Sequence, residues 1–402
     1  MAMNPDLLKL HPYPFEKLTQ LKSGIHPPSN KSHIALSIGE PKHDAPQIAL
    51  EILRDNLDKA SVYAATKGMP ELRQAICTWL SQRFHVPGDW LNPELHVLPV
   101  AGTREALFSF TQATIDRKRP AKIISPNPFY QVYEGAAILA GGEPVYLPCE
   151  ESLKFIPDYN AVPEETWRDC QLLFICSPGN PTGAVTDEAT LAKLIALSDK
   201  HDFIIASDEC YSEIYCDENS APIGLLEVCA KIGRKDFRNC VVFHSLSKRS
   251  NLPGLRSGFV AGDAEILRQY LSYRTYHGCA LPLHHQLASI GCWQDEVHVR
   301  KNRDMYREKF DRVLEILQPV MHVSQSDASF YLWPETPIND EEFALRLFQQ
   351  EHVTVLPGSY LSREVNGHNP GRNRVRLALV ATTDECLQAA ERIRRFVLSL
   401  KE

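Results

Sequence analysis

A lysine between small hydroxyl side chains is the sharpest chemical signal in the sequence. Ser245, Ser247 and Lys248 directly follow an apolar run, and Arg256 lies eight positions further along the chain. A lysine amine can form an imine with an aldehyde, while hydroxyl groups and a guanidinium can hold a phosphate dianion. The pattern favours a phosphorylated aldehyde as ligand, although lysines on polar loops are usually only solvated.

A carboxylate and a phenol follow another apolar run, about forty residues upstream. Asp208 ends the stretch FIIASD, and Tyr211 comes three residues later. A carboxylate here can keep a ring nitrogen protonated, which makes the ring an electron sink, and the tyrosine can reach a ring hydroxyl. An aspartate after a strand is also a common helix N-cap, so both interpretations are open at this point.

Two more turns follow apolar runs. Residues 177–183 (SPGNPTG) hold two prolines and two glycines, which indicates a rigid backbone, with a cis X-Pro bond as one form, that fixes Asn180 as a donor to an oxyanion. Gly102, Thr103 and Arg104 open a helical pattern, and a helix N-terminus suits a phosphate. An ordinary tight turn explains either motif alone, but not four turns that all follow strands.

The four turns require a sheet that brings them to one edge. Seven short apolar runs alternate with helical or loop segments between about residues 95 and 262, which predicts an α/β fold with a mostly parallel, seven-stranded central sheet and flanking helices. Doubly wound proteins bind ligands at the carboxyl ends of such strands. The predicted strands are residues 97–100, 122–125, 144–147, 172–176, 203–207, 241–244 and 259–261.

Helical patterns and prolines divide the rest of the chain. Apolar residues recur at helical spacing from Leu72 to Phe84, residues 299–317 are helical and charged, and Thr382 and Glu385 form a capping-box pattern before a last helix. Prolines space the first forty residues, which favours an extended arm. We therefore expect an arm (1–45) that joins the small domain, a large domain (46–285) and a smaller α+β domain (286–402).

Composition excludes several classes of partner. The 402 residues carry a net charge of −7 with acids and bases interspersed, so neither nucleic acid nor an anionic membrane is expected to bind. The eleven cysteines are scattered and form no C-x-x-C pair, which predicts reduced, mostly buried thiols and no metal site. No apolar stretch approaches the roughly 20 residues of a membrane span, and we expect a cytoplasmic protein.

Taken together, the turns resemble those of the class I/II aminotransferases of fold type I, in the same order and over nearly the whole chain. The resemblance implies pyridoxal 5'-phosphate as cofactor, Lys248 as its Schiff-base lysine and Asp208 as the partner of the pyridine nitrogen. Asn180 and Tyr211 would bind the ring 3-oxygen, and Tyr130, in PNPFY, would stack on the ring. The phosphate would be held by Gly102, Thr103, Arg104, Ser245, Ser247 and Arg256.

The same resemblance implies substrate contacts and a shared site. Tyr63, in VYAATKGMPELR, resembles the tyrosine that reaches the phosphate of the neighbouring subunit, which implies a homodimer. Arg376, in NRVRLALV, resembles the arginine that binds the substrate α-carboxylate, with Gly39 and Asn180 beside it. A buried arginine needs an acidic partner, and an internal Asp or Glu would serve equally well. Ser257 departs from the family, which usually has an apolar residue there.

Several segments most resemble the N-succinyldiaminopimelate aminotransferases of bacterial lysine biosynthesis, among them NPDLLKLHPYPFEKL, LSIGEPKH and SLSKRSNLPGLRSGF. This implies amino transfer from N-succinyl-LL-2,6-diaminopimelate to 2-oxoglutarate, which yields glutamate (EC 2.6.1.17). The alternatives are another class I aminotransferase acting on aspartate or aromatic amino acids, a pyridoxal-phosphate β-lyase, and a ligand-sensing domain of a transcription regulator. The lack of a helix-turn-helix pattern counts against the last.

Overall fold

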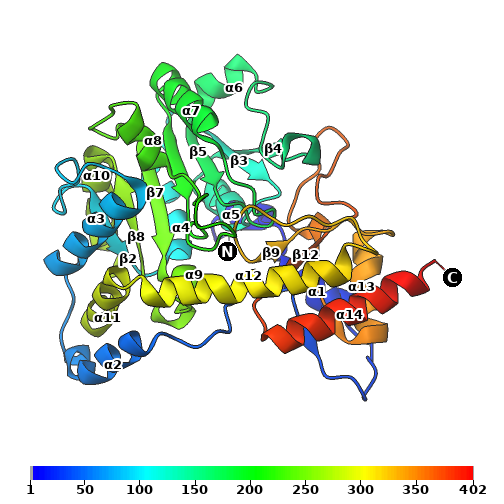
Figure 1. Cartoon of the computed structure of the whole chain (residues 1–402). Coiled ribbons are helices and arrows are strands. Elements are labelled where there is room, and N and C mark those ends of the chain that lie inside the picture. The colour runs from blue at the N-terminus through cyan, green and yellow to red at the C-terminus, as the bar shows by residue number, and fades with distance from the viewer. Residues whose placement is uncertain (1–2, 402) are drawn as a thin grey trace.

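A seven-stranded sheet forms the centre of the protein. The computed structural model describes residues 3–401, and in it the strand order is β2-β8-β7-β6-β5-β3-β4 (Figure 1). β8 runs antiparallel to both of its neighbours, β2 and β7, and the other pairs are parallel. The predicted α/β fold and all seven predicted strands are confirmed. They are β2 (Val97–Val100), β3 (Lys122–Asn127), β4 (Glu143–Pro148), β5 (Cys170–Cys176), β6 (Ile204–Asp208), β7 (Cys240–Ser245) and β8 (Gly258–Gly262).

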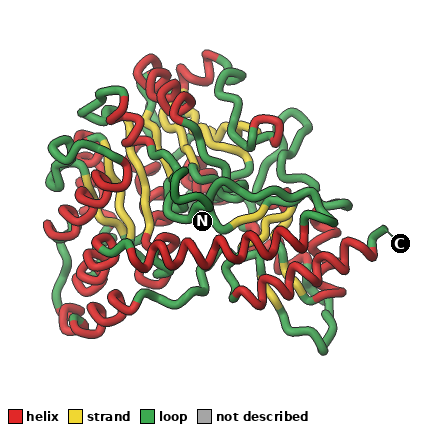
Figure 2. Tube along the Cα trace, viewed as in Figure 1, coloured by secondary structure: helices red, strands yellow, loops and turns green. Residues whose placement is uncertain are grey.

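The inner strands read as continuous apolar runs because both faces of the sheet are covered. In β5, Leu172 and Phe174 enter the core on one face, while Leu173 and Ile175 enter the core on the other. Successive side chains of a strand point to opposite faces, so a strand buried on both sides needs apolar residues throughout. Figure 2 shows the helices around these strands.

Two groups of helices supply the covering layers. One group contributes to the same core as Leu173 and Ile175 of β5: α2 (Gln47–Asp55), α3 (Pro70–Phe84), α6 (Glu164–Asp169), α7 (Glu188–His201), α8 (Leu225–Lys231) and α11 (Leu283–Gln294). The other packs on the opposite face: α4 (Thr103–Thr114), α5 (Val132–Leu139) and α10 (Ala264–His277).

A second core lies beside the sheet and is built on three long helices, α12 (Val297–Leu317), α13 (Asp340–Glu351) and α14 (Thr383–Ser399). α12 runs from the large sheet to this core (Figure 1). The predicted capping box is present at the start of α14. A three-stranded antiparallel sheet of order β11-β12-β9 accompanies the helices. The short strands are β9 (Tyr331–Leu332), β10 (Val353–Thr354), β11 (Leu356–Pro357) and β12 (Val375–Ala378).

The N-terminal segment differs from the extended arm that its prolines predict. It contains η1 (Pro5–Lys9) and α1 (Pro14–Leu21), and each begins with its proline because the first turn of a helix needs no N–H there. β1 (Ile34–Ala35) then pairs with β10, and Ile34 enters the second core. The segment therefore joins the smaller part, while the domain limits near 45 and 285 stay predictions. The remaining short helices are η2 (Leu57–Ser61), η3 (Glu151–Leu153), α9 (Leu246–Arg249), η4 (Pro253–Leu255) and η5 (Gly358–Tyr360).

Two further features concern the thiols and the length of the helices. All eleven cysteines are free, and most are buried, as predicted. Across residues 3–401, we find no helix with both the length and the apolar character that a membrane crossing requires.

Candidate functional site

A cavity of about 590 Å³ lies where the parallel strands end. Asp208 ends β6, Ser245 ends β7, and α9 follows at once with Lys248. Every residue with a predicted role lines this cavity except Gly102 and Tyr63. The predicted residues that line it are Gly39, Thr103, Arg104, Tyr130, Asn180, Asp208, Tyr211, Ser245, Ser247, Lys248, Arg256 and Arg376.

Lys248 has the environment of a nucleophilic amine. Ser245 caps α9 by accepting a hydrogen bond from the Ser247 N–H (3.1 Å), which fixes the turn that carries the lysine. The Lys248 ammonium donates to the Gly39 carbonyl (2.6 Å) and lies 5.4 Å from the ring centre of Phe330. Burial lowers the pKa of Lys248 to about 8, so a sizeable share of the amine is neutral near physiological pH.

Asp208 is a buried carboxylate that forms no ion pair within residues 3–401. The Tyr133 hydroxyl donates to its Oδ2 (2.7 Å), and the Cys210 N–H donates to its Oδ1 (3.3 Å). No helix begins at Asp208, since the next one along the chain is α8, so the helix N-cap interpretation is wrong. Burial raises the pKa of this carboxyl, and a cation at the cavity end of Asp208 would restore its charge.

Arg376 is the complementary case, a buried cation without an acidic partner. Its Nη1 donates to Asn180 Oδ1 (2.9 Å), its Nη2 donates to the Ser37 carbonyl (2.6 Å), and its guanidinium lies 4.6 Å from the ring centre of Tyr331. Its Nε has no partner, and no Asp or Glu within residues 3–401 forms an ion pair with it. The internal-carboxylate alternative is therefore not realised, and a ligand carboxylate fits the site.

The turn that carries Asn180 has the rigid backbone that its sequence predicts. The Ser177-Pro178 and Asn180-Pro181 bonds are both cis. The turn places the Asn180 side chain against Arg376 at the cavity wall, so both residues face the same ligand.

Gly102 and Arg256 form a cradle for an anion. Gly102 has a φ of 86° at the start of α4, and a Cβ there would lie only 2.2 Å from Nη2 of Arg256. Gly102 thus contacts the site through Arg256, although it does not line the cavity. The N-terminus of α4, the hydroxyls of Ser245 and Ser247 and the Arg256 guanidinium offer the donors that a phosphate dianion requires.

The residues present therefore fit pyridoxal phosphate. The cradle suits its phosphate, Asp208 suits its ring nitrogen, and the Lys248 amine suits its aldehyde. Because Asp208 and Lys248 line one cavity, a single ligand can reach both.

Tyr331 and Tyr133 are site residues that the sequence analysis missed. The Tyr331 hydroxyl lies 2.9 Å from the Tyr211 hydroxyl and would be 2.1 Å from a Cβ at Gly39, so a side chain at position 39 would displace Tyr331. Tyr133 follows Tyr130 in one short segment, and no local pattern distinguishes the partner of Asp208 from its neighbour.

Three further predicted residues have mixed outcomes. Tyr130 lines the cavity and accepts a hydrogen bond from Arg104 Nε (2.6 Å). Tyr63 is fully exposed (102%) away from the cavity, so its role toward a neighbouring subunit stays a prediction. The Ser257 hydroxyl lies 2.7 Å from that of Ser289, and this buried hydrogen bond explains how a polar residue is accommodated there.

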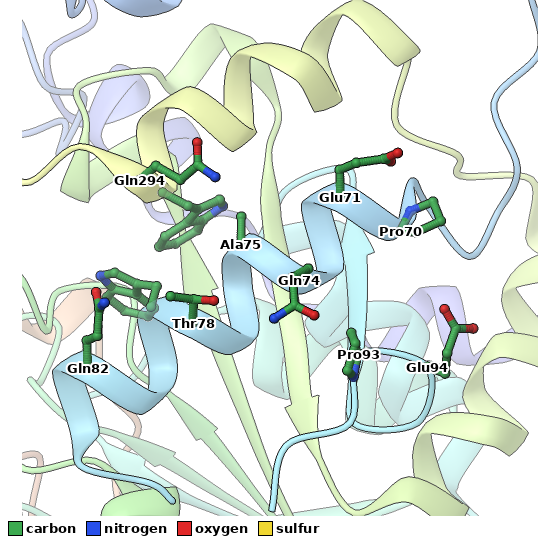
Figure 3. A pocket seen from close by; sticks show the side chains of 11 residues that line it. Pro70, Glu71, Gln74, Ala75, Thr78, Gln82, Pro93, Glu94 and Gln294 are labelled. Carbon is green, nitrogen blue, oxygen red and sulfur yellow. The ribbon is translucent and has the colours of Figure 1, made fainter. Parts of the chain in front are cut away.

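A second hollow, of about 620 Å³, lies along α3 (Figure 3). Gln74, Thr78 and Gln82 recur every four residues, so they share the exposed face of the helix, and Gln294 closes one side. None of the residues with a predicted role lines this hollow. It is a polar surface groove, distinct from the strand-end cavity.

Known proteins are similar to this chain over nearly its whole length. The sequence profile of the aminotransferases of class I and II matches residues 31–393. An LL-diaminopimelate aminotransferase of Maridesulfovibrio salexigens is 31% identical over 393 residues, which cover 96% of this chain and 97% of that protein. A crystal structure of an aminotransferase from Neisseria meningitidis Z2491 is 47% identical, with a TM-score of 0.92 and 100% of both chains covered. A probable N-succinyldiaminopimelate aminotransferase from Thermus thermophilus is 26% identical, with a TM-score of 0.82, covering 95% of this chain and 99% of that one.

Proposed function

Since the chain belongs to the class I and II aminotransferases, we propose that it transfers the amino group of N-succinyl-LL-2,6-diaminopimelate to 2-oxoglutarate. It is a pyridoxal-phosphate-dependent enzyme of fold type I. One observation carries the proposed chemistry. Within residues 3–401, Arg376 is a buried cation without an acidic partner. It lines the same cavity as Lys248, whose amine has a lowered pKa of about 8.

The residues divide the proposed reaction among them. When bound, pyridoxal phosphate supplies an aldehyde that condenses with amines and a ring that accepts an electron pair. Arg376 and Asn180 orient the substrate α-carboxylate, which points the α-hydrogen at Lys248. The Lys248 amine, with its pKa lowered to about 8, removes the α-proton as general base and can return it.

Two residues at the other end of the site serve the same step. Asp208 holds a proton at the position of the ring nitrogen, because a buried carboxylate is stabilised by a cationic neighbour. We assign the Tyr211 hydroxyl, which is paired with Tyr331, to the ring oxygen. The amino group then passes to 2-oxoglutarate in a second half-reaction that uses the same residues, and ping-pong kinetics follow.

A similar protein supports the succinylated donor, because the Thermus thermophilus structure is that of a probable N-succinyldiaminopimelate aminotransferase. Succinylation replaces the distal ammonium of diaminopimelate by an amide and a further carboxylate, so the distal part of the site must accept an anionic tail in place of a cation.

Free LL-diaminopimelate is the second candidate donor. The Maridesulfovibrio salexigens relative and several others about 30% identical to this chain are LL-diaminopimelate aminotransferases. The two donors share their reacting end and differ only at the distal end, so the choice between them depends on lining residues without an assigned role, such as Tyr13, Phe15 and Leu361.

A donor panel tests the proposal. Glutamate formation from 2-oxoglutarate is measured with N-succinyl-LL-diaminopimelate, LL-diaminopimelate, aspartate and phenylalanine. We expect the highest kcat/KM with the succinylated donor. A preference for LL-diaminopimelate establishes the second candidate, and activity confined to aspartate or phenylalanine overturns both. Pyruvate and ammonia from a cysteine-type substrate without acceptor indicate a β-lyase, and no turnover of any donor revives the ligand-sensing alternative.

We also propose a homodimer in which Tyr63 completes the site of the other subunit. Its exposed ring lies among further exposed apolar side chains, Leu57 and Val62, which favours contact with a second copy of the chain. Mixing inactive Lys248→Ala and weakened Tyr63→Phe subunits should restore activity, because each hybrid dimer contains one intact site. Failure of the mixture to gain activity after subunit exchange contradicts shared sites.

A further inference from the structure

A buried lysine outside the cavity has no acidic partner. Lys309, near the middle of α12, is only 1% exposed. Its ammonium donates to His43 Nε2 (2.6 Å) and to the carbonyls of Ala381 (2.5 Å) and Leu379 (3.3 Å), and it forms no ion pair within the described part of the chain. Burial lowers its pKa. Buried ammonium groups are costly unless paired, so this one calls for a reason beyond packing.

The hydrogen bonds of Lys309 continue to the main chain of Lys248. An ammonium can only donate, so His43 Nε2 is the acceptor and His43 Nδ1 carries the proton, which it donates to Asn302 Oδ1 (2.8 Å). Asn302 Oδ1 also accepts from Asn251 Nδ2 (2.8 Å). Asn302 Nδ2 therefore points to the carbonyls at the end of α9, those of Lys248 (3.3 Å) and its successor Arg249 (3.4 Å).

This row of hydrogen bonds joins the three segments that meet at the substrate. His43 lies four residues after Gly39 in the segment between β1 and α2, and the Gly39 carbonyl accepts from the Lys248 amine. Leu379 and Ala381 directly follow β12, the strand that carries Arg376. Lys309 and Asn302 both project from α12, the helix that runs between the two cores (Figure 1).

We propose that Lys309, His43 and Asn302 are positioning residues that hold Arg376 in register with the Lys248 amine. This inference rests on the proposed function, because it assigns the carboxylate of the donor to Arg376 and its α-hydrogen to Lys248. In the described part of the chain, none of the three residues hydrogen-bonds to Gly102 or Arg256, so we expect the phosphate contacts of the cofactor to survive their loss.

Two variants test the network in the holoenzyme. Lys309→Met keeps the length of the side chain and removes its donors, while His43→Phe keeps the ring that lies 4.6 Å from the ring centre of Tyr306. A misplacement of about 1 Å at a reacting centre costs ~10²-fold in rate. We expect kcat/KM for the donor to fall ~10- to 100-fold in each variant, with the cofactor dissociation constant and the visible absorbance unchanged. The double variant should lose no more than either single one, because one row of bonds is broken in all three.

Arg392→Met is the matched control. Arg392, on α14, is also buried and donates to two main-chain carbonyls, those of Ser32 (2.7 Å) and Glu351 (3.2 Å), but it bonds to neither Lys248 nor the end of β12. Its variant should keep the kcat/KM of the wild type. An equal loss in the control, an equal loss of cofactor affinity in Lys309→Met, or unchanged kcat/KM in both test variants overturns the proposal. If Lys309→Met does not fold, His43→Phe decides by the same outcomes.

A second readout does not depend on turnover. In the cofactor-free protein, amide hydrogen exchange of residues 246–250 and 376–381 should quicken in Lys309→Met and His43→Phe but not in Arg392→Met. An inactive wild type in the donor panel refutes the proposed function alone, because the exchange result still reports on the network. Unchanged exchange in both segments refutes the network.

Discussion

Replacing Arg376 by methionine tests how the cavity recognises a substrate. The guanidinium already donates to Asn180 and Ser37, and a carboxylate placed beside it gains two charge-assisted hydrogen bonds in a buried setting. Each such bond contributes about 1.5–3 kcal/mol, so their loss costs about 3–6 kcal/mol in transition-state stabilisation. At 1.36 kcal/mol per tenfold, kcat/KM for the donor falls ~10²- to 10⁴-fold in Arg376→Met.

The assay must separate the carboxylate contact from general damage. Single-turnover absorbance changes isolate the donor half-reaction, and 1,5-diaminopentane serves as a donor without carboxylates. The slow rate with this amine should be the same in Arg376→Met and the wild type. Arg374→Met is the control variant, because Arg374 bonds to Glu151 and the Trp333 carbonyl outside the cavity. An equal loss with 1,5-diaminopentane, or the same loss in Arg374→Met, refutes the assignment.

Three further variants test other parts of the site. Asp208→Asn should bind the cofactor normally, as its absorbance will report, while kcat falls at least ~10²-fold because the ring nitrogen loses its anionic partner; a wild-type kcat contradicts this. Gly102→Ala places a side chain at a left-handed φ and against Arg256, so it should raise the cofactor dissociation constant ~10- to 100-fold in a titration. Gly233→Ala is the control, because Gly233 has a similar φ of 76° but open space around it, and it should leave that constant unchanged. In the cofactor-free protein, burial lowers the pKa of Lys248 from 10.5 to about 8, so its ionisation destabilises the fold below about pH 8 and this penalty fades as the pH rises towards 10.5. Lys248→Met should therefore raise the free energy of unfolding by about 3 kcal/mol at pH 7 and by clearly less at pH 9.5, measured by urea denaturation. An equal gain at both pH values contradicts a lowered pKa of Lys248.

The sheet and most of the site were predictable because their signals are local. Each strand is a short apolar run with a turn after it, and a strand buried on both faces can have no other composition. The turn residues Asp208 and Lys248 then come to one edge through topology alone. The resemblance to a known family supplied the roles that spacing could not, such as that of Arg376.

Contacts between distant segments were not predictable. Tyr133 meets Asp208, and Tyr331 meets Tyr211, only because separate elements fold against each other, and any of several aromatic residues in those runs could have done so. Lys309 looks like one more charged residue on a solvated helix until its surroundings are known. Proline suits both an extended segment and the first turn of a helix, so Pro14 alone does not distinguish an arm from the start of α1.

Because β8 runs antiparallel to β7, the short loop between these strands carries both the reactive amine and the arginine of the phosphate cradle. Lys248 and Arg256 are eight residues apart between β7 and β8, whereas Lys248 and Arg376 are held together only by noncovalent contacts between remote segments. The entropic cost of bringing two residues together grows with the length of chain between them, so contacts between remote segments break before those within a short loop. Mild heat or low denaturant should therefore abolish catalysis while the yellow colour of the bound cofactor persists. Protein inactivated in this way keeps the loop that binds the cofactor, so its activity can be recovered on cooling.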